Sequence, residues 1–272
     1  MSNIYTTPIT GNIAFSNVGT IKAVGSFGEK ISVGKIEYQH FDDESFQYII
    51  SPLWDIIDGL PTTIFAGIPG IMMEKRLENY YRVNYVPVFI TERTPSPNRE
   101  DLWELLESVD LDYYDRLEWL IRTPMRAAND NLIVERMREN KEIINFKHSK
   151  KGLNRLQYGD EVIVDKISDF GSTPGSLLKT LAMVLFTGAD IRIESTKKII
   201  SKEERSVLIP FILTGYYAAV REQKNLQKSG ISDAKKAGKY KGRAKTEIDK
   251  AMFKESLKNS RRNRLPLMKL CQ

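Results

Sequence analysis

The sequence predicts an α/β domain in its second half and an α+β, β-rich domain in its first half. The α/β domain is predicted from a strand–helix–strand pattern between residues 158 and 194, and from a long polar helical stretch after it. The first half is predicted from short β-branched runs separated by glycines, followed by two helical patterns. We therefore expect one domain over residues 1–135, a second over residues 136–245, and a basic helix or tail over residues 246–272.

The strand–helix–strand pattern is the strongest local signal. The run Glu161–Ile167 is rich in β-branched residues, and a Gly/Ser/Thr/Pro loop separates it from a helical pattern for which Ser176 is the expected N-cap. Gly188 ends that helix, and Ala189–Glu194 is the next predicted strand. Two strands connected by a helix pair in parallel, because an antiparallel pair needs only a short turn. The pattern therefore predicts a parallel sheet with helices on its faces.

One long helix is predicted after this unit. Residues 207–220 are apolar and are expected to begin as a strand or turn at Pro210 and then to continue as a helix. Residues 218–237 contain no strong helix breaker except Gly230, and Gly238 and Gly242 are expected to end the helix. A last helix is predicted to start at Thr246.

The first half is predicted from short-range signals. Strands are expected at Ile13–Phe15, Ile21–Val24, Ile31–Val33, Lys35–Tyr38, Phe46–Ile50, Val86–Ile90 and Leu132–Val134, with a further strand at Ile143–Phe146 ahead of the parallel unit. The loop Asp42–Ser45 has the composition of a hairpin turn. Amphipathic spacing predicts helices over Arg99–Val109 and Leu111–Ile121, and Thr63–Met73 is expected to be a buried, irregular segment.

Composition excludes several classes of protein. An apolar share of 41% over 272 residues is enough for sizeable cores and excludes a disordered chain. Cys271 is the only cysteine, so no disulfide can form within the chain, and a reducing compartment such as the bacterial cytosol is expected. The N-terminus lacks a signal-peptide pattern, and the longest apolar run is too short to span a bilayer. His40 and His148 lack nearby ligand partners in the sequence, so no metal or cofactor is expected.

Positive charge is concentrated at the C-terminal end. Residues 221–272 contain 16 Lys or Arg against 5 Asp or Glu, a net charge of +11. Since the whole chain has a net charge of +6, the preceding 220 residues have a net charge of −5. An acidic body with a basic tail favours a polyanionic partner, most often nucleic acid. A solvated helix or tail without a partner has the same composition, and this alternative stays open.

Two motifs, in order and about 60 residues apart by the numbering, resemble a known family. The first is Gly159–Asp160, an apolar strand, then Lys166–Thr173 (KISDFGST); the second is Gly230–Arg243 (GISDAKKAGKYKGR). Both resemble the catalytic domain of serine site-specific recombinases, the resolvases and invertases, over residues 140–260. The resemblance implies a resolvase-like α/β fold, a long helix, and an arm that lies in the DNA minor groove.

The same comparison implies that strand cleavage is lost. Where the family has Asp-Arg-x-Gly-Arg, this chain has Ser168, Asp169, Phe170, Gly171 and Ser172, so both arginines are missing. Attack of a hydroxyl on a phosphodiester needs fixed cations around the phosphate, because negative charge develops there. The family's first strand, which carries the nucleophilic serine, is matched only faintly by Ile90–Thr94 and Ile13–Thr20. We therefore expect no catalytic residues.

A weaker likeness concerns the first half. The segments Ser45–Tyr48, Phe65–Gly70 and Tyr114–Trp119 are similar to parts of the N-terminal subdomain of HipA-type toxin kinases. No kinase segment follows them, so this likeness implies a binding surface without activity.

The expected nucleic-acid contacts lie at the end of the long helix and in the tail. The tail holds only 27 residues after Lys245, fewer than a helix-turn-helix module needs, so contacts to the minor groove and the phosphates of duplex DNA are expected. The candidate residues are Lys235, Lys236, Lys239, Tyr240, Lys241, Arg243, Lys245, Arg261, Arg262 and Arg264.

These observations predict a cytoplasmic, catalytically inactive, recombinase-like DNA-binding protein of a phage or mobile element, forming a homodimer through residues 218–237. One alternative is a protein-interaction, inhibitory or RNA-binding factor that uses the same fold as a scaffold. Another is a diverged recombinase that still cleaves DNA.

Overall fold

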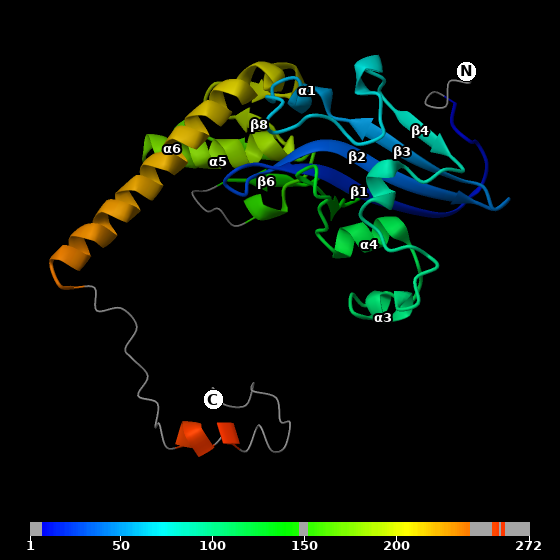
Figure 1. The fold of residues 1–272 in the computed structure, drawn as a ribbon. Helices are drawn as coiled ribbons and strands as arrows, with labels where there is room; N and C mark the ends of the chain where they lie inside the picture. Colours follow the sequence, from blue (N-terminus) through cyan, green and yellow to red (C-terminus); the bar gives the residue numbers. More distant parts are fainter. Residues whose placement is uncertain (1–6, 147–151, 240–251, 256, 259–272) are drawn as a thin grey trace. The chain divides into compact units, whose positions relative to one another are not determined.

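The computed structural model describes residues 7–146, 152–239, 252–255 and 257–258, and Figure 1 shows the course of the chain. The chain divides into two compact units, residues 1–222 and residues 223–272. The boundary expected at residue 135 falls inside the first unit, and the one expected at residue 245 lies outside the described residues.

The first unit contains a five-stranded antiparallel sheet with the strand order β4-β3-β2-β1-β5. The strands are β1 (Ile13–Val24), β2 (Lys30–Phe41), β3 (Phe46–Pro52), β4 (Tyr80–Val83) and β5 (Leu132–Arg136). The short strands expected between residues 13 and 38 are merged here into two long ones. Gly19 and Gly34 lie inside β1 and β2 rather than between strands. At position 19 the neighbouring strand leaves no room for a larger residue, because an added Cβ would lie 2.6 Å from Cγ1 of Val134.

Sequence reasoning made two errors in this half. It missed β4, and it predicted a strand at Val86–Ile90 where the chain forms the helical turn α2 (Val88–Thr91). Pro87 is the N-cap of this turn, and Phe89 and Ile90 are fully buried. A short apolar run cannot by itself distinguish a buried strand from a buried helical turn.

The other helices of this half are short. They are α1 (Trp54–Ile57), the 3₁₀ turn η1 (Met73–Lys75), α3 (Leu102–Glu107) and α4 (Arg116–Arg122). Both predicted amphipathic helices are confirmed, but the second starts five residues later than expected. Asp115 is its N-cap, and its carboxylate accepts the N–H groups of Leu117 and Glu118 at 2.7 and 3.0 Å.

The second sheet has the strand order β6-β7-β8-β9. Its strands are β6 (Ile143–Asn145), β7 (Glu161–Val164), β8 (Asp190–Ile193) and β9 (Lys198–Ile200). The pairs β6–β7 and β7–β8 are parallel, and β9 pairs antiparallel with β8. The predicted parallel strand–helix–strand unit is therefore confirmed, with α5 (Pro174–Thr187) as its helix. Two 3₁₀ turns, η2 (Leu153–Arg155) and η3 (Ile167–Phe170), flank β7.

The N-cap of α5 is Thr173 and not Ser176 as expected. The Thr173 hydroxyl accepts the N–H of Ser176 at 3.2 Å, and the Ser176 hydroxyl accepts the N–H of Thr173 at 3.1 Å. Pro174 takes the first helical position. The N–H that proline lacks is not needed there, because the first N–H groups of a helix have no carbonyl within the helix to donate to. Gly188 ends the helix in the left-handed conformation with φ 81°, as predicted.

A helix of 35 residues, α6 (Lys202–Lys236), follows the second sheet. The expectation of a strand or turn at Pro210 is wrong, because Pro210 lies inside this helix. Pro210 has no N–H to offer the carbonyl of Ser206, one turn earlier. Gly59 packs against the helix at that point, so closely that an added Cβ would lie 3.0 Å from the Ser206 oxygen. No helix in the described part of the chain is long and apolar enough to cross a membrane.

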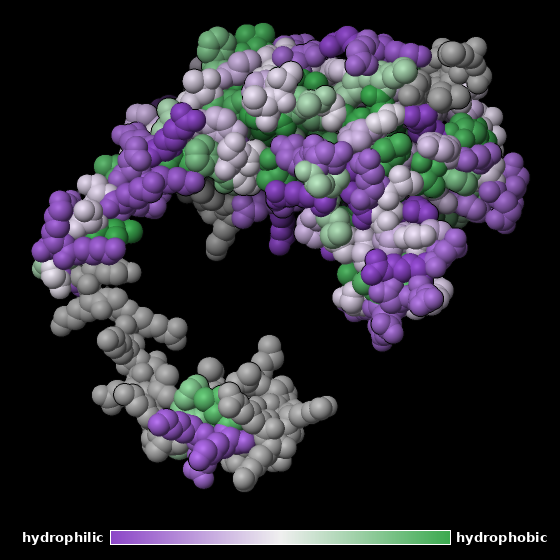
Figure 2. All heavy atoms as spheres, in the orientation of Figure 1, coloured by the Kyte–Doolittle hydropathy of each residue, from purple (hydrophilic) through white to green (hydrophobic). Residues whose placement is uncertain are grey.

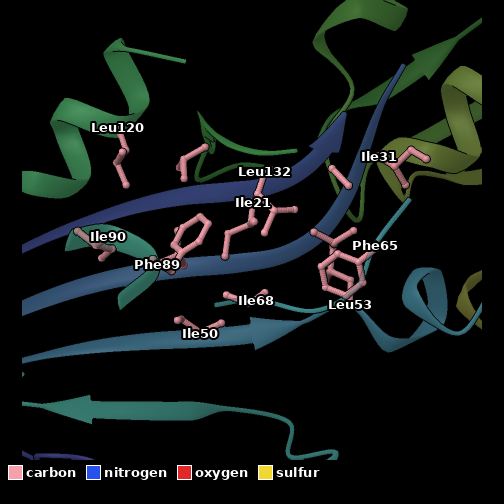
Figure 3. Close-up of a cluster of buried hydrophobic side chains, with 14 of the residues drawn as sticks. Ile21, Ile31, Ile50, Leu53, Phe65, Ile68, Phe89, Ile90, Leu120 and Leu132 are labelled. Carbon is pink, nitrogen blue, oxygen red and sulfur yellow. The ribbon is translucent and has the colours of Figure 1, made fainter. Parts of the chain in front are cut away.

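The main core packs the antiparallel sheet against α5 and α6, the helices of the second half, which explains why residues 1–222 form one unit. It includes strand residues such as Ile21 and Ile50, and also Ala182 and Phe186 of α5 and Ile209 of α6. The irregular segment Thr63–Met73 contributes buried Ile64, Phe65 and Ile68, as predicted. Figure 3 shows side chains from the strands, from this segment and from Phe89–Ile90 gathered in one cluster. A second, smaller cluster lies between α5 and the β6–β9 sheet.

One buried arginine connects the parts of the first unit. The Arg205 side chain on α6 is 2% exposed, and it donates to the carboxylates of Asp55 on α1 and Asp190 on β8. Its guanidinium lies over the ring of Tyr158, 5.3 Å from the centroid, and the Tyr158 hydroxyl donates to Asp55 at 3.2 Å. Burial, together with the nearby Asp55 carboxylate, raises the pKa of Tyr158 to about 12, so this hydroxyl stays a donor at neutral pH.

A second polar cluster fixes α4 on the sheet. The Glu118 side chain is 5% exposed and accepts hydrogen bonds from Asn17 at 3.0 Å, from Arg122 at 2.8 Å and from Arg136. Burial raises the pKa of Glu118, but the hydrogen bonds from Arg122, Asn17 and Arg136 outweigh that effect and hold it below its usual value. The folded state therefore favours the ionised carboxylate.

Replacing Arg205 by methionine is expected to lower the free energy of unfolding by about 3–5 kcal/mol, because Asp55 and Asp190 would lose the cation between them. Urea denaturation followed by circular dichroism measures this. The matched control is Arg76→Met, since Arg76 and Asp58 form an ion pair at the surface, and its transition should stay near that of the wild type. Equal losses for the two variants would contradict a structural role for the buried cluster.

Glu118→Gln is expected to change how stability depends on pH. Because the folded pKa is lowered, the ionised Glu118 stabilises the protein above its unfolded pKa of about 4.3, and this contribution is lost as the pH falls through the folded pKa. The difference in unfolding free energy between wild type and variant should thus shrink from pH 7 toward about pH 3. Glu44→Gln serves as the control, since the Glu44 side chain is 89% exposed. A difference that is constant over this range would refute the assignment.

Candidate nucleic-acid interface

The part of α6 that belongs to the second unit is polar and exposed. Every residue from 223 to 233 is exposed, and the run is polar apart from Gly230 and two apolar residues, Leu226 and Ile231, which do not form a continuous apolar face. Figure 2 shows mostly hydrophilic side chains (purple) on the visible face of this stretch. A helix that is polar on all sides has no apolar face to bury, so its surface stays in contact with solvent, where a partner can reach it.

Three lysines of this stretch share one face of the helix. Lys224, Lys228 and Lys235 are spaced i, i+4, i+11, which places them within an arc of about 40° at 3.6 residues per turn. At a rise of 1.5 Å per residue they extend over about 16 Å of helix. Asp233 lies on the opposite side, where its carboxylate accepts the Ser229 hydroxyl at 3.4 Å. Between residues 223 and 236 the helix thus carries a row of positive charge separated from Asp233, the one acidic residue of that stretch.

The helix ends where the sequence predicts. Gly238 has φ 66°, and its N–H donates to the Lys235 carbonyl at 3.1 Å while the N–H of Lys239 donates to the Ala234 carbonyl at 2.9 Å. These two bonds form a Schellman motif, which ends a helix at a left-handed glycine. Lys235 and Lys236 occupy the last turn, where cations also interact favourably with the helix dipole.

The structure places three of the ten candidate residues at this end of the helix. Lys235, Lys236 and Lys239 are exposed there. The remaining seven, Tyr240, Lys241, Arg243, Lys245, Arg261, Arg262 and Arg264, lie outside the described residues. Of the predicted last helix, residues 252–255 and 257–258 are described and are helical. Sequence reasoning missed Lys224 and Lys228, although their spacing at the helical period is visible in the sequence.

The motif that resembles a recombinase active site has a structural role here. Asp169 accepts the N–H of Lys166 at 3.0 Å, which closes the 3₁₀ turn η3. Phe170 is buried in the second core, with its ring 5.2 Å from that of Phe146. The side chains at the positions of the family's two arginines are Asp169 and Ser172. The segment therefore stabilises the connection between β7 and α5.

The segments that follow the carboxyl ends of β7 and β8 carry a net negative charge, which does not favour binding of a phosphodiester. In open parallel sheets, ligands bind at this edge of the sheet. The connecting residues 165–173 and 194–197 contain Asp165, Asp169 and Glu194 against Lys166 and Lys197, and they contain no arginine. The net charge of these two segments is −1, whereas phosphoryl transfer needs fixed cations.

The two faint candidates for the family's first strand do not lie in the parallel sheet. Ile13–Thr20 belongs to β1 of the antiparallel sheet. Ile90–Thr94 begins in the last two residues of α2 and continues into the following turn, where the buried Arg93 donates to the Phe89 carbonyl at 2.7 Å and to Asp130. Neither segment is a strand of the second sheet, in which the neighbours of β7 are β6 and β8. Neither therefore supplies the serine-bearing strand that the family has beside this motif.

Comparison of the chain with models of protein families, with curated proteins and with solved structures finds no significant match. Within the described residues, no three His, Cys, Asp or Glu side chains come together in a way that could hold a metal ion.

Proposed function

We propose that this chain is a recombinase-like DNA-binding protein that does not transfer strands, and that it binds duplex DNA through the basic end of α6 and the arm that follows. The observation that carries the proposal is the row of Lys224, Lys228 and Lys235 on one exposed helical face. The net charge of +11 over residues 221–272 supports it. The motif Gly230–Arg243, which resembles the end of the long helix and the arm of serine recombinases, continues directly from this row.

The preformed helix and its charge determine how the affinity for DNA is expected to behave. Lysines on a rigid element can meet phosphates without a large loss of backbone entropy, because the helix is already formed. Each phosphate that is neutralised releases condensed counterions, so the affinity must fall steeply as salt is added. The resemblance implies that Lys241 and Arg243 of the arm enter the minor groove, whose negative potential attracts such side chains.

A homodimer through residues 218–237 is part of the proposal. Leu226 is 67% exposed and lies on the side of the helix opposite Lys224, so a second copy could cover it while leaving the lysine row accessible. Sedimentation velocity of the wild type and of Leu226→Asp measures this directly, and a monomeric wild type would remove the dimer from the proposal.

Binding to a labelled duplex of about 30 base pairs, followed by fluorescence anisotropy between about 50 and 300 mM KCl, tests the interface. Replacing Lys224, Lys228 and Lys235 together by glutamine should reduce the slope of log K against log salt by up to about 2.7, since each phosphate that is no longer neutralised accounts for about 0.9. The variant with Lys241→Ala and Arg243→Ala tests the arm in the same way.

The matched control replaces Lys141, Lys198 and Lys202 by glutamine, three exposed lysines of the first unit, and so changes the net charge equally. Its slope should stay at the wild-type value. Equal effects of the two triple variants would mean that net charge alone matters, and absence of binding at low salt would reject the proposal. Tighter binding to an RNA hairpin than to the duplex would favour the RNA-binding alternative.

Strand transfer is expected to be absent, because Asp169 and Ser172 stand where the family has arginines. Incubation with supercoiled plasmid, followed by denaturing electrophoresis for a covalent protein–DNA adduct, tests this expectation. An active serine recombinase run in parallel shows that the assay traps adducts. An adduct formed by this chain would support the alternative of a diverged, active recombinase.

A further inference from the structure

The antiparallel sheet carries a pocket that the DNA-binding proposal does not use. Its floor is made by four aromatic side chains, Phe15 on β1, Tyr38 on β2, and Phe46 and Tyr48 on β3. They share one face of the sheet because side chains alternate along each strand and because Tyr38 is the partner of Tyr48. The rings pack on one another, with centroids 4.9 Å apart for Tyr38 and Tyr48 and 6.2 Å apart for Phe15 and Tyr38.

The loop that leads into α4 forms the wall of this pocket. Asp115 anchors the loop as the N-cap of α4, and the Tyr114 hydroxyl donates to the Pro95 carbonyl. The floor and wall together enclose about 630 Å³, within the range of small-molecule sites. The lining residues are Phe15, Tyr38, His40, Phe46, Tyr48, Val86, Tyr113, Tyr114, Asp115 and Arg116.

The charged groups of the wall differ in what they can offer a ligand. The Asp115 carboxylate is occupied by the N–H groups of Leu117 and Glu118 and by the Asn17 amide. The Arg116 guanidinium donates to the Thr94 hydroxyl at 2.8 Å and lies over the Tyr114 ring. No carboxylate of the described residues forms an ion pair with Arg116. The pocket therefore offers a cation whose charge is not balanced by a salt bridge.

We propose that this pocket binds a small aromatic carboxylate, with its ring against the aromatic floor and its carboxylate on Arg116. An aromatic ring gains from stacked or edge-on contact with the floor, and a guanidinium matches a carboxylate in charge and in geometry. A ligand with an ammonium group would instead meet Arg116 as a like charge inside a partly desolvated pocket.

A nucleic acid fits this pocket poorly. Residues 100–112, which lead to the wall, contain six carboxylates and no cation. A polyanion would run past these charges, whereas a small ligand with one carboxylate would interact mainly with Arg116, since exposed charges farther away are screened by salt. The pocket assignment is independent of the DNA-binding proposal, because it uses residues of the first unit alone.

Three probes with the same ring test the assignment: indole-3-acetate, its neutral amide indole-3-acetamide, and the cationic tryptamine. Calorimetric titration of the full chain should show indole-3-acetate binding about ten-fold or more tightly than the amide, because a charged hydrogen-bond pair replaces a neutral one. Tryptamine should bind weakest. Arg116→Gln should remove the preference for the acetate, while Arg126→Gln, which alters an exposed arginine, should retain it.

A second pair of variants tests the floor. Phe15 is 41% exposed and Ile13 on the same strand is 50% exposed, so truncation of either to alanine should leave the protein folded, which thermal unfolding verifies. Phe15→Ala should weaken the binding of all probes that bind, and Ile13→Ala should leave it unchanged. Tryptamine binding as tightly as indole-3-acetate would overturn the charge assignment. No heat from any probe at millimolar concentration would overturn the site itself.

Discussion

The ion cluster around Arg205 is the interaction on which the arrangement of the first unit depends. Arg205 is buried, so its charge requires partners, and it finds them in two carboxylates that are far apart in the sequence, Asp55 and Asp190. These residues belong to α1, beside the antiparallel sheet, and to β8 of the second sheet. Because the guanidinium has a fixed, forked geometry, the cluster specifies the orientation of α6 against α1 and β8 as well as holding these elements together.

Apolar packing reinforces this arrangement. The helix α5 contributes Ala182 and Phe186 to the main core and Val184 and Leu185 to the smaller one, so it is buried on both sides. A helix with two buried faces cannot serve as a flexible boundary, because separating the sheets would expose one of them to water. The β-rich half and the parallel unit therefore share one cooperative body, and the candidate DNA contacts at the end of α6 belong to the other unit.

The distribution of charge separates the proposed roles. The segments beyond β7 and β8 are acidic in balance, and so is the approach to the aromatic pocket over residues 100–112. The basic residues are instead concentrated in residues 221–272, where the described lysines share one helical face. Under the proposed function, this distribution directs a polyanion toward the basic residues and away from the acidic segments, without any base-specific contact. The pocket, in contrast, places Arg116 among aromatic rings, beside an Asp115 carboxylate that already accepts the N–H groups of Leu117 and Glu118.

Sequence alone determined those features that depend on neighbouring residues. The β7–α5–β8 unit, the hairpin at Asp42–Ser45 and the helix end at Gly238 were predicted because periodicity and turn chemistry act over a few residues. Tertiary structure decided the rest. Gly19 lies within a strand and leaves room for Val134 of the neighbouring strand, Pro210 lies within a helix that packs on Gly59, and the pocket unites three strands with a distant loop. Such contacts join residues that are far apart in the chain, and no local pattern encodes which of them will meet.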